Sequence, residues 1–278
     1  MSKLKATLIR SLLADGSRAR LEQIELFDSI ASTNSYLLEQ PPPKAGHYRV
    51  AIADHQTAGR GRHSRRWVSP PGAGLCLSFA YTFSAMPRQM PSLTLAIGVA
   101  VMTSLRDLGA AGVSLKWPND IVARDGKLGG VLTEVQRRGG GEVTVVTGVG
   151  INLDLPAGAK ETIGSDWARS PVDLKRVMDR MPAMEVIVAA IIDGLSEAMQ
   201  KFATHGFSGF AADWAEYDWL RNREVSVDLP DRQLSGIATG VDADGALLID
   251  TGNEKVRVIS GSIVMAGAWQ GGNVAGLT

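Results

Sequence analysis

The chain has 278 residues, 45% of them hydrophobic, and its 29 basic and 29 acidic residues give a formal net charge of zero. This length suits one large domain and a small one around a sizeable core, and the neutral balance provides no global basic field for nucleic acid. The single cysteine, Cys76, excludes an intrachain disulfide framework. No apolar run of about 18 residues would span a membrane, and residues 1–20 lack the features of a secretory signal, which favours the cytoplasm.

Helix and strand patterns alternate along residues 1–219 and predict a mixed α and β domain. Ser32 is expected to cap a helix that the prolines at 41–43 end, and Asp125-Gly126 is a strong hairpin signal. The expected strands are 21–30, 48–54, 74–83, one through 113–117, two short runs joined by the hairpin turn, and 142–153. Residues 1–20 are basic and helix-compatible; the expected helices are 32–40, one that starts near Pro91 and ends before Gly109, and about 171–219, with an irregular loop at 154–170.

The last part of the chain has a different sequence pattern. From Glu224 to Met265, short β-rich runs are separated by LPDR, DADG and TGNE, which is typical of a small antiparallel barrel. We therefore expect two domains, 1–220 and 221–278.

The stretch HQTAGRGRHSRRW, His55 to Trp67, interleaves glycines with arginines. Glycines let a backbone approach a ligand closely, and guanidinium groups suit carboxylates and phosphates. The pattern therefore indicates a loop that closes over anions. A solvated basic loop and a nucleic-acid patch are the alternatives, although one aromatic residue among the charges argues against the patch.

The stretch KWPND, Lys116 to Asp120, places a lysine, an amide and a carboxylate around a strand-ending proline. Pro-Asn-Asp commonly builds a turn. The functional alternative is that Lys116 faces phosphates while Asp120 helps to hold a hydrated Mg²⁺.

Two further stretches, DGKLGGVL with Lys127 and TGVGINL, put glycines inside apolar strands, where glycine often marks close approach of a ligand. Neither forms a Rossmann fingerprint or a phosphate-binding P-loop, and no G-x-S-x-G serine elbow is present. Cys76 is expected in the core. The four histidines lack metal-ligand spacing and are expected at the surface or in loops: His47, His55, His63 and His205.

In this order, these stretches resemble the biotin protein ligases (biotin–[acetyl-CoA-carboxylase] ligases). The family patterns are met by S-T-N at 32–34, G-R-G-R-x-x-R-x-W at 59–67, K-W-P-N-D at 116–120, K-L-x-G at 127–130 and G-x-G-I-N at 148–152. The resemblance runs from about residue 24 to 266. It implies an α+β fold: a mixed-sheet catalytic domain of the biotin/lipoate ligase type and a small C-terminal SH3-like β-barrel. Residues 154–182 match no family motif and receive no role.

The resemblance also implies site roles. The expected biotin-binding residues are Ser32, Thr33, Asn34, Gln56, Gly59, Arg60, Gly61, Arg62, Lys127, Gly129 and Gly148. The expected ATP-binding residues are Arg62, Arg65, Trp67, Lys116, Asn119, Asp120, Lys127 and Asn152, with Asp120 also meeting the Mg²⁺ that accompanies ATP. Lys127 is expected to be the main catalytic cation, with Arg60 and Arg62 beside it, because positive charge must offset repulsion between a carboxylate and the α-phosphate.

The implied reaction converts biotin and MgATP to biotinyl-5′-AMP and pyrophosphate, then transfers biotin to a lysine of a biotin carboxyl carrier protein. No tightly bound cofactor and no membrane are expected, and a homodimer stays open. Only 31 residues precede Ser32, which is too few for the winged-helix DNA-binding domain of bifunctional members, so we expect a monofunctional ligase without DNA. The alternatives are a lipoate or octanoate ligase, a DNA-binding biotin sensor and a catalytically silent binding module.

Overall fold

The larger of two β-sheets contains seven strands in a computed structural model, which describes residues 4–62, 65–124, 126–137, 141–158, 171–229 and 232–265. Its strands are β1 (Leu21–Ile30), β2 (Tyr48–Gln56), β3 (Gly74–Phe83), β4 (Val113–Lys116), β5 (Asp120–Ala123), β6 (Gly126–Arg137) and β7 (Val143–Asn152). Their order across the sheet is β1-β2-β3-β7-β6-β5-β4; β1 and β2 are parallel and the other neighbours antiparallel. The predicted mixed sheet is confirmed.

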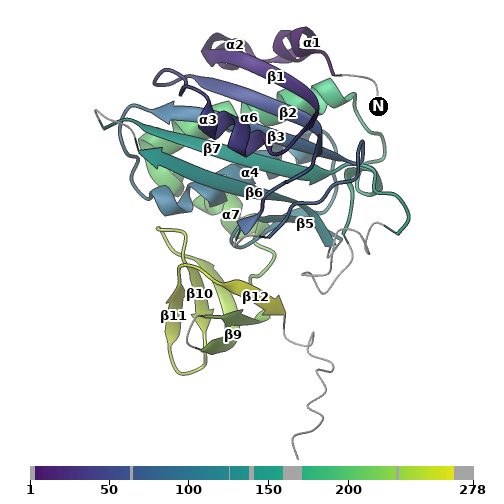
Figure 1. The fold of residues 1–278 in the computed structure, drawn as a ribbon. Helices are drawn as coiled ribbons and strands as arrows, with labels where there is room; N and C mark the ends of the chain where they lie inside the picture. The colour runs from purple at the N-terminus through teal and green to yellow at the C-terminus, as the bar shows by residue number, and fades with distance from the viewer. Residues whose placement is uncertain are drawn as a thin grey trace, which may run out of the picture.

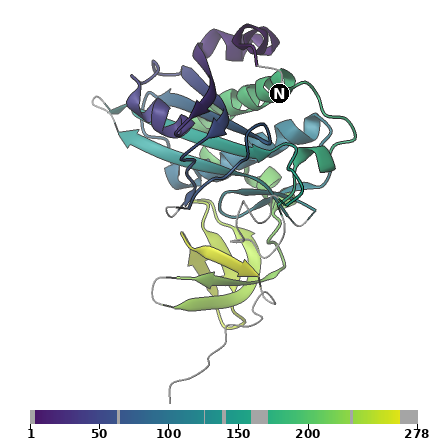
Figure 2. The same ribbon diagram turned by 45° about the vertical axis from the view of Figure 1, so that its right-hand side comes forward.

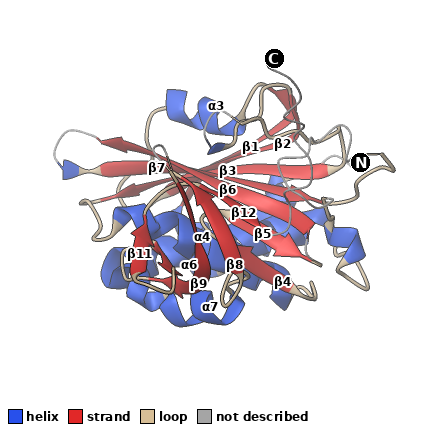
Figure 3. Ribbon diagram, turned by 90° about the horizontal axis from the view of Figure 1, so that it is seen from below, coloured by secondary structure: helices blue, strands red, loops and turns tan. Residues whose placement is uncertain are grey.

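Helices cover both faces of this sheet (Figure 3). They are α1 (Ala6–Leu12), α2 (Asp15–Arg20), α3 (Thr33–Glu39), α4 (Leu93–Asp107), α6 (Met184–His205) and α7 (Ala211–Tyr217). Helix α3 lies on one face, over β2, β3 and β7, whereas α4 and α6 lie on the other. Within the described residues, no helix is both long enough and apolar enough to cross a membrane.

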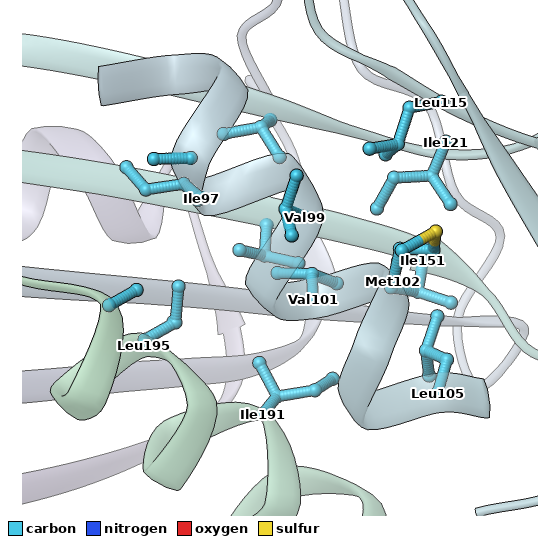
Figure 4. Packing of buried hydrophobic residues seen from close by; sticks show 14 of the residues in the cluster. Ile97, Val99, Val101, Met102, Leu105, Leu115, Ile121, Ile151, Ile191 and Leu195 are labelled. Atoms are coloured by element: carbon cyan, nitrogen blue, oxygen red, sulfur yellow. The ribbon is translucent and has the colours of Figure 1, made fainter. Parts of the chain in front are cut away.

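The main core lies between the sheet and the α4–α6 pair. Figure 4 shows Val101 and Met102 of α4 among side chains of the sheet and of α6, which contributes Ile191. Strand β3 is buried at every position, because α3 covers its second face. This explains why its sequence is apolar nearly throughout instead of alternating. Cys76 of β3 is buried, as expected.

Local sequence signals set the ends of α3. The Ser32 side chain accepts a hydrogen bond from the Ser35 backbone N–H at 3.4 Å, and the helix ends at Glu39, before the prolines. Both features confirm the prediction, because a hydroxyl satisfies a free N–H at a helix start and proline cannot continue a helix.

The prediction of helices over about 171–219 is wrong for the first part of this range. Residues 171–183 contain only a 3-10 turn, Leu174–Arg176, which the Asp173 carboxylate caps by accepting from the Arg176 N–H at 3.0 Å. Pro171 and Pro182 bracket this segment and disfavour a continuous helix. The long helix begins at Met184.

The second sheet is antiparallel, with strands β8 (Glu224–Asp228), β9 (Gln233–Val241), β10 (Leu247–Asp250), β11 (Lys255–Val258) and β12 (Ser262–Met265). Their order is β11-β10-β9-β8-β12, in agreement with the expected small C-terminal β domain. Figures 1 and 2 show this sheet beside the large one at the β4–β5 end. The domain boundary at residue 220 stays a prediction.

A turn of the small sheet contacts the large domain directly. The Trp117 indole N–H donates to the Gly245 carbonyl at 2.9 Å. Gly245 has φ +81°, and a Cβ there would lie 2.7 Å from Cβ of Ser92, just before α4. Only glycine fits this turn, so the contact depends on close backbone approach.

Candidate active site

A cavity of about 280 Å³ opens on the face of the large sheet that carries α3. It is bounded by the start of α3, the arginine-glycine loop (residues 59–67), the β4–β5 turn, and strands β3, β6 and β7. Three residues of the small domain complete the wall: Asp228, Gly261 and Ile263. Five stretches that are distant in sequence therefore meet at one place.

Nearly all of the residues predicted from the sequence line this cavity. Those residues are Ser32, Thr33, Asn34, Gln56, Arg60, Gly61, Arg62, Arg65, Trp67, Lys116, Asn119, Asp120, Lys127, Gly148 and Asn152. Gly59 and Gly129 do not line it. A Cβ at Gly59 would lie 2.4 Å from the Trp67 carbonyl oxygen, and one at Gly129 would lie 2.5 Å from the Gly150 carbonyl oxygen. These two glycines permit backbone packing behind the wall.

One end of the cavity is lined by uncharged polar side chains, Ser32, Thr33, Asn34, Gln56 and Ser78. Gln56 fixes the position of Thr33, because Gln56 Oε1 accepts a hydrogen bond from the Thr33 backbone N–H at 2.8 Å. The Ser78 hydroxyl donates to Asn34 Oδ1 at 2.5 Å and lies 2.6 Å from the Thr33 hydroxyl. Gly148 leaves room for this group, because a Cβ there would lie 2.6 Å from Asn34 Oδ1. The result is a buried hydrogen-bonding end with fixed geometry.

Within the arginine-glycine loop, the described residues 59–62 and 65–67 hydrogen-bond to each other. The Gly61 N–H donates to the Arg65 carbonyl at 2.8 Å, and the Trp67 N–H donates to the Gly59 carbonyl at 3.0 Å. Arg60 pairs with Glu134 of β6, with Nη2 and Oε2 2.6 Å apart. The described part of the loop is thus attached to the sheet and lines the cavity. His63 lies outside the described residues.

The other end of the cavity concentrates charge. Lys127 Nζ lies 2.6 Å from Asp120 Oδ1, and Lys116 is only 8% exposed. Burial, against the opposing effect of Asp120 and together with the charges of Lys127 and Arg65, lowers the pKa of Lys116 to about 8. Burial also lowers the pKa of Arg62, again against the pull of Asp120. Several cations thus share one carboxylate, which leaves an excess of positive charge for an anionic ligand.

Trp67 packs against a glycine of β7. A Cβ at Gly150 would lie 2.5 Å from Cε2 of the Trp67 ring, so any other residue at position 150 would displace the indole. Lys127 Nζ lies 5.9 Å from the ring centroid, within reach of a cation–π interaction. The second glycine of the G-x-G stretch, Gly150, is therefore required for packing against Trp67 and is not part of a dinucleotide-binding fingerprint.

Two predicted nucleotide-side amides make structural contacts. Asn119 Nδ2 donates to the Val131 carbonyl at 2.8 Å, which supports the turn interpretation of Pro-Asn-Asp. Asn152 Nδ2 donates to the Lys127 carbonyl at 3.1 Å and to the Val172 carbonyl at 3.0 Å. These bonds hold the backbone that carries Lys127.

Sequence reasoning missed several residues of the wall. Ser78 is a polar residue inside an apolar strand, which was an available signal. Pro171, from the segment without an assigned role, lines the cavity next to Val172, whose N–H donates to the Lys127 carbonyl at 3.0 Å. The three small-domain residues had no local signal.

The expected surface or loop position of the histidines is wrong for His55, which is half-buried in strand β2 with its ring Nδ1 3.3 Å from the Ser69 carbonyl. His205 is exposed at the end of α6, as expected. Within the described residues, no group of three or more His, Cys, Asp or Glu side chains could hold a metal ion.

Comparison with known proteins agrees with this site. The Biotin/lipoate A/B protein ligase family matches residues 26–152, and the Biotin protein ligase C terminal domain matches residues 222–265. The chain is 35% identical to the biotin–[acetyl-CoA-carboxylase] ligase of Mycobacterium tuberculosis over 262 residues, which cover 90% of this chain and 91% of that protein. It is 34% identical to the bifunctional ligase/repressor BirA of Escherichia coli over 251 residues, or 89% of this chain and 73% of BirA.

Among solved structures, the biotin protein ligase of Aquifex aeolicus in complex with biotin and ATP is similar, with a TM-score of 0.70 and 25% identity. The match covers 88% of this chain and 97% of that one. The fold and the site define a ligase of the biotin and lipoate class. The chain belongs to the biotin protein ligase family.

Proposed function

We propose that this chain is an ATP-dependent ligase that activates biotin as biotinyl-5′-AMP and transfers the biotinyl group to a lysine of a biotin carboxyl carrier protein. The observation that carries the proposal is the division of one cavity into a neutral hydrogen-bonding end and a cationic end. Biotin has the matching division, with an uncharged ureido ring at one end and a carboxylate at the other.

At the neutral end, Ser32, Thr33, Asn34 and Gln56 would bind the ureido ring, with Gly148 leaving space beside them. Ser78 would join this set, because its hydroxyl contacts both Thr33 and Asn34. Buried groups that are already oriented discriminate well, since a ligand without matching donors and acceptors would leave them unpaired.

At the cationic end, one carboxylate oxygen of biotin would attack the α-phosphorus of ATP, and the bond to the bridging oxygen of pyrophosphate would break. Lys127, Arg60 and Arg62 would offset the repulsion between the two anions. Asn119, Asn152, Arg65, Trp67 and Lys116 would bind the nucleotide, with Trp67 against the adenine. This displacement depends on positioning and charge stabilisation more than on an acid or base.

Mg²⁺ would enter with ATP as part of the substrate complex. Asp120 is the carboxylate that we expect to meet it, although it is engaged by Lys127 at 2.6 Å. Magnesium in such complexes is held by one or two carboxylates together with phosphates and water, which fits the Asp120 carboxylate at this end.

In the second half-reaction, the amine of the carrier lysine would attack the acyl carbon of the adenylate, AMP would leave and the amine would lose a proton. The mixed anhydride hydrolyses readily, so the cavity must exclude water until the carrier docks. The arginine-glycine loop would cover the intermediate, with glycines as hinges. We place this chemistry in the cytoplasm, where carboxylase carrier proteins and ATP meet.

The test offers biotin, lipoate and octanoate separately, each with MgATP and a biotin carboxyl carrier domain, and measures the carrier by mass spectrometry. A mass gain with biotin alone is expected. A gain only with lipoate or octanoate would support the alternative ligase class. A DNA mobility assay separates the biotin-sensor alternative, for which added protein would retard DNA.

A further inference from the structure

Glu134 of β6 connects the two parts of the site that close on a ligand. Its Oε2 accepts from Asn34 Nδ2 at 2.9 Å and from Arg60 Nη2 at 2.6 Å. Asn34 belongs to the neutral end, and Arg60 belongs to the arginine-glycine loop. One carboxylate oxygen therefore bridges the buried polar end and this loop.

The bridge continues through the neutral end. Asn34 Nδ2 donates to the Glu134 carboxylate and approaches the Leu132 carbonyl at 3.4 Å. Because both contacts use the NH₂ group, the amide oxygen Oδ1 points away from Glu134. There Oδ1 accepts from the Ser78 hydroxyl at 2.5 Å. A continuous chain of contacts thus runs Ser78–Asn34–Glu134–Arg60, from strand β3 to the loop.

The bridge is accessible to solvent but not freely exposed. The Glu134 side chain is 27% exposed and that of Arg60 is 41% exposed. A pair at this depth is screened, so its contribution is modest and sensitive to geometry. A modest, breakable contact suits a loop that must open for substrates and for the carrier.

We propose that Glu134 is a positioning residue that holds the arginine-glycine loop closed over the biotin end of the cavity and orients the Asn34 amide at the same time. The inference rests on the proposed biotin adenylation. Glu134 touches neither the reacting carboxylate nor the α-phosphate in this scheme, and it acts through Arg60 and Asn34. Its loss should therefore affect capture of biotin and retention of the adenylate more than the rate of adenylation.

The experiment compares the wild-type chain with Glu134→Gln, Arg60→Ala and the double variant. Pyrophosphate release gives kcat and the KM for biotin, and appearance of free biotin and AMP from preformed adenylate, without carrier, gives the escape rate. For Glu134→Gln we expect the KM for biotin and the escape rate to rise about fivefold, with kcat within about twofold of wild type. In the double variant, the rise in the escape rate should be smaller than the product of the two single effects, because each substitution already removes the Glu134–Arg60 contact.

The matched control is Glu22→Gln. Glu22 pairs with Arg49 at 3.0 Å and is 19% exposed, which is similar to the Glu134 pair, and it does not line the cavity. This variant should keep wild-type escape and KM. Circular dichroism checks that each variant is folded.

The outcomes separate the two hypotheses. If wild type releases no pyrophosphate from biotin and MgATP, the proposed function fails. If wild type forms the adenylate but Glu134→Gln retains it as well as wild type, or if the two substitutions add fully in the double variant, the role of Glu134 is refuted.

Discussion

The two ends of the cavity use different physical means to bind parts of one ligand. At the neutral end, Thr33, Asn34 and Ser78 are buried and linked through the Ser78 hydroxyl, so their geometry is set before a ligand arrives. At the cationic end, Lys116 and Lys127 share Asp120 and carry an excess of positive charge. The first end is built for selection and the second for stabilising charge that appears during the reaction.

Because the two ends bind by different means, substitutions at them should have different effects. Loss of a group at the neutral end should weaken biotin binding, whereas loss of a cation should slow adenylation or weaken ATP binding. If substitutions at the two ends had the same effects on biotin binding and on adenylation, the two ends would not have separate roles.

The largest effect is expected for Lys127→Ala. Its loss removes the cation and also leaves the Asp120 carboxylate facing two anionic substrates. We expect pyrophosphate release to fall by about a hundred- to a thousandfold. The matched control is Lys175→Ala, since Lys175 pairs with Asp154 at 2.6 Å on the exposed surface, outside the cavity. A near wild-type rate for Lys127→Ala would remove Lys127 from the chemistry.

A second test displaces Trp67 without changing any charge. In Gly150→Ala the new methyl group would lie 2.5 Å from the indole, so the ring must move. We expect the KM for ATP to rise about tenfold or more, since loss of base stacking weakens nucleotide binding. The melting temperature should also fall, because overpacking costs about 1–3 kcal/mol.

The nearby Gly130→Ala is the steric control for this test. Its Cβ would meet Lys127 Cε at 3.5 Å, an ordinary contact, so its melting temperature should stay near that of wild type. An unchanged KM for ATP in Gly150→Ala would show that Trp67 is not needed for the nucleotide.

Most of the strands and helices could be predicted because their signals are local. Strand β3 and helix α4 follow from apolar patterns between turn residues, and Ser32 identifies the start of α3. The motif residues also reach one cavity because each motif lies at a strand end or a turn. Local sequence patterns therefore predicted both the fold class and the residues of the candidate site.

The remaining residues depend on contacts that are distant in sequence. Glu134 matters because β6 carries it to Asn34 and to Arg60, and Pro171 matters because its segment returns to Lys127. Asp228 reaches the cavity only because the small domain packs beside the β4–β5 turn. The spacing of residues within the sequence does not predict these long-range contacts.

A smaller effect is expected at the neutral end, for Ser78→Ala. This change removes the donor to Asn34 Oδ1 and a partner of the Thr33 hydroxyl in a buried place. We expect the KM for biotin to rise about fivefold to tenfold, because an unmade buried hydrogen bond costs about 1–1.5 kcal/mol. The KM for ATP should not change, and an equal rise in both constants would contradict the separation of the two ends.

Ser69→Ala controls for loss of a buried hydroxyl. Ser69 is 4% exposed, and its Oγ has no hydrogen-bond partner among the described residues. Removing it should leave the KM for biotin unchanged.

The smallest effect concerns the pH dependence of ATP use. The pKa of Lys116 in the folded protein is about 8, below the ordinary 10.5, so this lysine loses its charge as the pH rises past 8. We expect kcat/KM for ATP to fall a few fold between about pH 7.5 and 9, since this ratio reports ionisation of the free enzyme. Lys116→Arg keeps its charge in this range and should flatten the profile.

The same shift has a consequence for stability with the opposite sign. Between pH 8 and 10.5 the unfolded chain binds more protons at this position than the folded protein does, so the Lys116 contribution to stability rises with pH. Activity with ATP and this contribution to stability should therefore change in opposite directions above pH 8. A wild-type profile as flat as that of Lys116→Arg would show that the charge of Lys116 does not serve the nucleotide, and that the cationic end depends on Lys127 and the loop arginines.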